Sequence, residues 1–134
     1  MSSYKKKDHA EHNEKACNFL HTQGDYPDWV VTTAFYAALH FVQNEIFPTD
    51  IGEKRYISFD NYYNGHFNST QNKPSKHVAT INLVYSELSE EASYLYKWLF
   101  DTSMTARYRN FNIDSKIADL SKKRLFELKG FLNK

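Results

Sequence analysis

Polar side chains lie at regular spacing on the otherwise apolar segment 29–42. In a helix, Tyr36 and His40 share one face with Trp29 and Thr33. A buried polar group without a partner costs about 1–3 kcal/mol, so these side chains need hydrogen bonds or a ligand. Two interpretations stay open. Tyr36 and His40 either bond across the core or line a cleft in which His40 is an acid, a base or a phosphate contact.

Four further candidates lie at expected helix ends. Arg107 and Arg109 flank Tyr108, and arginine suits phosphate contacts while a tyrosine ring can stack on a base. The alternative is a structural corner, with Arg107 bonding helix carbonyls and Tyr108 filling the core. His77 opens a predicted helix, where its charged form is disfavoured. A partly exposed surface histidine is the alternative there.

Metal chemistry is not indicated. His9 and His12 are three residues apart near the N-terminus, but neither a His-Glu-x-x-His nor a Glu-x-x-His pattern occurs. A glycine-rich phosphate loop and a nucleophile elbow are also absent from the sequence. We therefore expect no metal and no cofactor.

Composition points to one soluble domain over residues 1–134. With 17 basic and 16 acidic residues the net charge is +1, so nucleic-acid binding would need a local basic patch. Cys17, the only cysteine, excludes an intramolecular disulfide. Neither a signal-peptide pattern nor an apolar run of roughly 20 residues occurs. A cytoplasmic protein without membrane contact is expected.

Helical periodicity dominates the chain and predicts an all-α, up-and-down bundle of four to five helices. The second helix, which is apolar nearly all round, should be central. Whether the third and fourth helices are separate stays open, although Ser89 has the chemistry of a new helix start. The expected helices cover residues 6–22, a second one that begins within 25–28 and runs to about 47, then 75–88, 89–105 and a last one from 112 or 114 onward.

The segment 48–73 has no sustained helical period and is rich in aromatic residues. A loop of this length is usually functional or disordered, and a short strand pair or an extra helical turn fits inside it. Its aromatic rings need internal packing or a partner, which favours a symmetric homodimer. The rings belong to Tyr56, Phe59, Tyr62, Tyr63 and Phe67.

Three motifs, in order and spacing, resemble a group of small bacterial HEPN-like proteins. The likeness runs from about Trp29 to Tyr108. The motifs are Asp28-Trp29-x-Val31-x-x-x-Phe35-Tyr36-Ala37-Ala38-x-His40, then Ser75-Lys76-His77, then Leu99-x-x-x-Ser103-x-x-Ala106-Arg107-Tyr108.

This resemblance implies a helical bundle, often dimeric, from RNA-directed defence or toxin–antitoxin systems, sometimes beside a nucleotidyltransferase partner. Active members are metal-independent ribonucleases with an arginine and a histidine four to six residues apart. No histidine follows Arg107 or Arg109 here, so only Arg107 carries over. His40 or His77 would have to replace the missing base in space.

We therefore expect a HEPN-like domain that binds RNA or a nucleotide in a cleft. If it cleaves RNA, His40, His77 and Arg107 are the catalytic candidates; Tyr36, Tyr108 and Arg109 are the ligand-binding candidates. Antiparallel third and fourth helices would bring His40, His77 and Arg107 to one end of the bundle. The rival hypothesis is a non-catalytic protein-interaction or dimerisation module.

Overall fold

The computed structural model describes residues 4–67 and 73–134. Helix makes up 74% of these residues, which confirms the predicted all-α class. The described elements are α1 (Lys6–Gln23), α2 (Pro27–Ile46), β1 (Thr49–Ile51), β2 (Lys54–Tyr56), α3 (Phe59–His66), α4 (Lys76–Glu87), α5 (Glu90–Met104), the π-helical turn η1 (Thr105–Arg109) and α6 (Ser115–Lys129).

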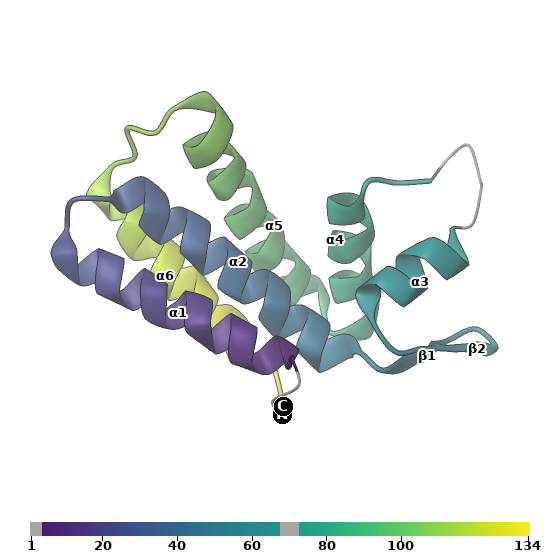
Figure 1. Ribbon diagram of the computed structural model, residues 1–134. Helices are drawn as coiled ribbons and strands as arrows, with labels where there is room; N and C mark the ends of the chain where they lie inside the picture. Colours follow the sequence, from purple (N-terminus) through teal and green to yellow (C-terminus); the bar gives the residue numbers. More distant parts are fainter. Residues whose placement is uncertain (1–3, 68–72) are drawn as a thin grey trace.

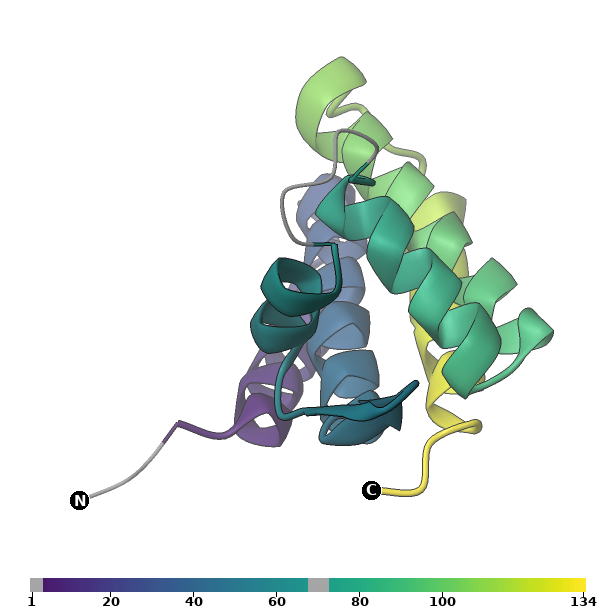
Figure 2. The ribbon, with the colours of Figure 1, turned by 90° about the vertical axis from the view of Figure 1, so that its right-hand side faces the viewer.

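Four helices form the body of the molecule, and α3, α4 and the β1–β2 hairpin stand on one side of it (Figure 1). Helices α1 and α5 run in one direction, and α2 and α6 run in the other. Figure 2 shows α4 alongside α5, with which it makes close contact. None of the described helices is long and apolar enough to cross a membrane.

Helix α2 is central, as its apolar sequence predicts. It contacts α1, α5 and α6, and Val31, Ala34, Phe35 and Ala38 on it are fully buried. Its first turn is different, because Trp29 is more than half exposed. The buried side chains along α2 therefore form the surface on which the other helices pack.

Local capping chemistry sets the helix ends. Gly24 ends α1 with a positive φ of 81°, a conformation that favours glycine. The Ser75 and Ser89 hydroxyls accept hydrogen bonds from the first amides of α4 and α5. The cap at Ser89 separates these two helices, so one continuous helix is excluded, and they run antiparallel.

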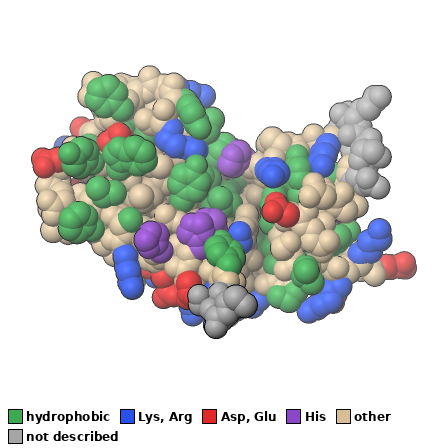
Figure 3. Space-filling model, in the orientation of Figure 1, with side chains coloured by type: hydrophobic (Ala, Val, Ile, Leu, Met, Phe, Trp, Pro, Cys, Tyr) green, Lys and Arg blue, Asp and Glu red, His purple; other side chains and the backbone are tan. Residues whose placement is uncertain are grey.

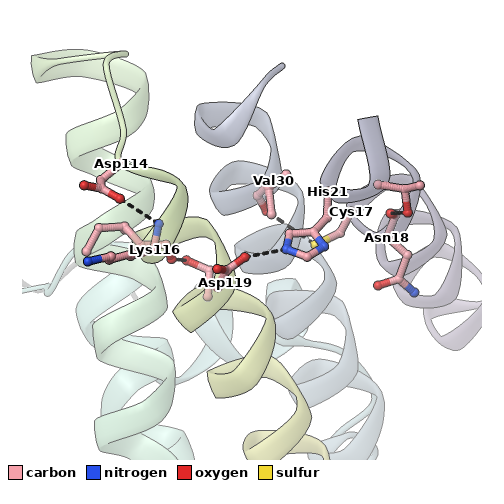
Figure 4. A network of polar contacts seen from close by, with 10 residues as sticks. Cys17, Asn18, His21, Val30, Asp114, Lys116 and Asp119 are labelled. Atoms are coloured by element: carbon pink, nitrogen blue, oxygen red, sulfur yellow. Dashed lines mark hydrogen bonds and ion pairs between the residues drawn. The ribbon is translucent and has the colours of Figure 1, made fainter. Parts of the chain in front are cut away.

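Polar contacts tie α1 and α6 together near one end of the body (Figure 4). His21 Nε2 lies 2.6 Å from Asp119 Oδ1. Close by, the Cys17 thiol is 3.5 Å from the Val30 carbonyl oxygen. The Asp114 carboxylate accepts a hydrogen bond from the Lys116 amide and caps α6. The first contact joins α1 to α6, and the second joins α1 to α2. Both lie at the end of the body where α2 and α6 begin.

Residues 49–66 of the predicted loop form two short strands and a helix, so the prediction of four to five helices is corrected to six α-helices in the described residues. Thr49 pairs with Tyr56 and Ile51 with Lys54 in a short antiparallel hairpin. Helix α3 has only 8 residues, too few to show a helical period. Residues 68–72 of the predicted loop lie outside the described residues.

The aromatic rings of this segment pack mainly on one another. The Tyr62 ring stacks on His66 with centroids 5.1 Å apart and meets Tyr56 edge-on at 5.4 Å. Phe47 at the end of α2 joins them. The rings are therefore accommodated within the chain, and they do not require a partner protein.

Candidate functional site

A cavity of about 250 Å³ lies between the second half of α2 and the start of α4. Figure 3 shows a hollow between the helical body and the α3–α4 side, with histidine side chains beside it. Two lysines, two histidines and one carboxylate are among the lining residues, which are Lys6, Leu39, His40, Gln43, Ser58, Phe59, Asp60, Lys76, His77 and Thr80.

His40 is neutral in this cavity. Its ring stacks on His9 with centroids 3.9 Å apart. Burial, followed by the charges of His9 and Lys6, lowers the pKa of His40 from 6.5 to about 4. Its buried Nδ1 has no hydrogen-bond partner among the described residues. The bond across the core, one of the two interpretations of the sequence, is therefore absent at this atom.

His77 lies on the opposite wall of the cavity, in the first turn of α4. Its ring stacks on Phe100 of α5 at 4.4 Å. Burial lowers the pKa of His77, and the charge of Arg107 lowers it further. Both histidines thus favour the neutral form, which can donate one hydrogen bond and accept another.

Arg107 lies in η1 and is held by three side chains. Its Nε donates to the Ser103 hydroxyl at 3.0 Å, one terminal nitrogen donates to the Tyr36 hydroxyl at 2.8 Å, and the other lies 3.6 Å from the Met104 sulfur. A guanidinium has five N–H groups, so these contacts leave two for a ligand. The Tyr108 ring centroid is 5.0 Å from the Arg107 guanidinium carbon.

Arg107 and Tyr36 adjoin the cavity but do not line it. The ring of Phe35 connects the two places, because its centroid is 6.1 Å from that of His77 and 5.8 Å from the Arg107 guanidinium carbon. The structure thus brings His40 and His77 to one cavity, while Arg107 lies outside its lining.

The other two predicted residues lie on the surface. Tyr108 is 70% exposed, so it does not fill the core as the structural alternative proposed. Arg109 is also exposed, and it is not among the residues that line the cavity. The Tyr108 ring lies beside the Arg107 guanidinium. Arg109 is one residue further along the chain.

Sequence reasoning missed the two lysines of the cavity. Burial lowers the pKa of Lys6, while the charge of Asp60 opposes this shift. Lys76 Nζ lies 3.9 Å from Asp60 Oδ1. Lys76 directly precedes His77, so the motif itself could have indicated it, but nothing in the sequence places Lys6 of α1 beside α4.

The charge of the cavity favours an anion. Lys6 and Lys76 face the single carboxylate of Asp60, and the neutral histidines add hydrogen-bonding groups. Within the described residues, no group of three or more His, Cys, Asp or Glu side chains could hold a metal ion. The arrangement suits a phosphate or a similar oxyanion.

Comparison with known proteins adds no relative to this picture: no protein-family model, no curated protein and no solved structure matches the chain.

Proposed function

We propose that this chain is a HEPN-like domain that binds RNA or a nucleotide, with a phosphate group in the cavity between α2 and α4. One observation carries the proposal: two lysines and two neutral histidines, from α1, α2 and α4, converge on one cavity that contains a single carboxylate. Such a constellation provides positive charge and hydrogen-bond donors for a phosphate.

Residues next to the cavity extend this proposal to the rest of a nucleotide. The exposed ring of Tyr108 lies over the Arg107 guanidinium. An exposed aromatic ring can stack on any nucleic-acid base. Arg107 keeps two N–H groups for a second phosphate. A strand that passes from the cavity to Tyr108 would use both places.

The geometry supports binding more than cleavage. Cleavage without a metal requires a base near the 2′-hydroxyl and a cation on the same phosphate. His40 can accept a proton and Lys6 and Lys76 supply cations in the same cavity, but the Nδ1 of His40 is buried, and Arg107, the one residue that carries over from the family motif, does not line the cavity. A nucleotidyltransferase-type partner follows from the resemblance alone, and a homodimer follows from the resemblance and from the aromatic residues of 48–73. Both stay part of the proposal.

Fluorescence anisotropy of a labelled single-stranded RNA, measured over a series of salt concentrations, tests the proposal. Lys76→Ala should weaken binding and reduce the salt slope by about one, because one phosphate contact is lost. Lys54→Ala is the matched control, since Lys54 is an exposed lysine on β2, away from the cavity lining. No saturable binding, or equal losses in the two variants, would contradict the proposal.

A further inference from the structure

A second hollow, of about 520 Å³, lies at the end of the molecule where α2 begins. Two connections form it, the one between α1 and α2 and the one before α6. Figure 3 shows hydrophobic side chains gathered beside acidic ones toward this end. The lining residues are Asp25, Tyr26, Pro27, Asp28, Trp29, Phe111, Asn112 and Ile113.

Three exposed aromatic side chains border this hollow. Tyr26 and Trp29 are each 53% exposed, and Phe111 is 69% exposed. Within the described residues, none of these three side chains takes part in a ring–ring contact, and each is more than half exposed. Exposing a large aromatic side chain to water is unfavourable, and neighbouring exposed aromatic side chains are common where a partner binds.

The charged side chains that line the hollow are both acidic. Asp25 and Asp28 line the hollow, no lysine, arginine or histidine does, and neither carboxylate has an ion-pair partner in the described part of the chain. Elsewhere the protein covers ring faces with its own cations, as Arg124 does at Trp98 and Lys129 does at Phe41. The hollow likewise has aromatic rings, but no cationic side chain lines it.

We propose that this hollow binds the ammonium group of a lysine side chain presented by a partner protein. Aromatic faces attract a cation through the ring quadrupole, and two carboxylates complete the charge. A phosphate would be repelled here, so the hollow has the opposite selectivity to the cavity between α2 and α4. The chain would thus have an anion site and a separate cation site.

The indole N–H signals in a nitrogen–proton NMR spectrum test this directly, because Trp29 lines the hollow and Trp98 is an internal control. The probe is Nα-acetyl-lysine methylamide, and the matched neutral compound is the norleucine analogue. We expect a saturable shift of the Trp29 signal with the lysine probe and no shift with the norleucine probe. The Trp98 signal should stay in place.

Asp25→Asn should weaken the response to the lysine probe several-fold, and since Asp25 is exposed the fold should be kept. Glu53→Gln, an exposed acidic residue outside the hollow, is the matched control. Equal shifts with both probes, an unchanged response in Asp25→Asn, or a response to spermidine without one to the lysine probe would each overturn the proposal.

Discussion

At His40, the surroundings of one side chain determine both its chemistry and its effect on stability. The ring is half-buried against His9, and its Nδ1 has no partner among the described residues. The folded protein therefore disfavours the protonated ring, whereas the unfolded chain does not. A histidine of this kind accepts hydrogen bonds or a proton from a ligand rather than acting as a fixed positive charge.

The lowered pKa of His40 predicts how stability depends on pH. Because the pKa falls from 6.5 to about 4 on folding, the unfolded state binds more protons between these values. The free energy of unfolding should therefore fall as the pH is lowered from about 6.5 to about 4. The lowered pKa of His77 also makes the free energy of unfolding fall as the pH is lowered.

Urea denaturation at several pH values measures this dependence. His40→Gln should flatten the fall in stability between pH 6.5 and 4, because glutamine does not titrate. His12→Gln is a suitable control, since His12 is an exposed histidine on α1. A slope that stays the same in His40→Gln would show that His40 is protonated normally in the folded protein.

Individual residues differed in how far their positions could be predicted. His40 was placed correctly on the polar face of α2, because helical spacing alone determines that face. The stacking partner His9 was considered only as a metal ligand with His12, since nothing local indicates that α1 brings it onto His40. Contacts between distant segments depend on tertiary packing, which spacing does not report.

At the scale of the elements, the break between α4 and α5 positions the site. The turn at Ser89 lets α5 run back along α4. This places His77 against Phe100 and near Arg107. A continuous helix would have separated His77 and Arg107 by its whole length. The capping serine therefore contributes to the site although it is distant from it.

Removing this cap gives a prediction about stability. Ser89→Ala removes the hydrogen bond from the Ala92 amide to the Ser89 hydroxyl and should cost about 1 kcal/mol. Ser86→Ala is the matched control, because Ser86 is exposed near the end of α4 and does not cap a helix. Denaturant unfolding compares the two, and equal stabilities would mean that the Ser89 cap is not needed for the turn.

Helix ends and the central helix were predictable because their signals are local. Gly24, Ser75, Ser89 and Asp114 all cap helices as their chemistry indicates. The β1–β2 hairpin and α3 were not predictable in detail, since each is too short for a clear period and is stabilised by packing of its aromatic rings. Short elements without a period need tertiary contacts to be identified.

For the molecule as a whole, two hollows on one helical scaffold differ in the sign of the charges that line them. The cavity between α2 and α4 has two lysines and one carboxylate, and the hollow at the start of α2 has two carboxylates and no cation. The net charge of +1 conceals this separation. Composition alone therefore excluded a general basic surface but could not indicate a local one.

The homodimer stays a prediction at this scale. It was argued from the aromatic residues of 48–73, but the described rings of that segment pack on one another and on Phe47. This internal packing removes the argument that the rings need a second copy of the chain. Any dimer would have to use a different surface.

The most direct test of the central claim follows the imidazole NMR signals of His40 and His77 during titration with a short single-stranded RNA. We expect both signals to shift with the same midpoint, because both rings line the cavity between α2 and α4, while the Trp29 indole signal stays in place. Unchanged histidine signals, or a shift confined to Trp29, would contradict the proposal that the cavity between α2 and α4 binds RNA.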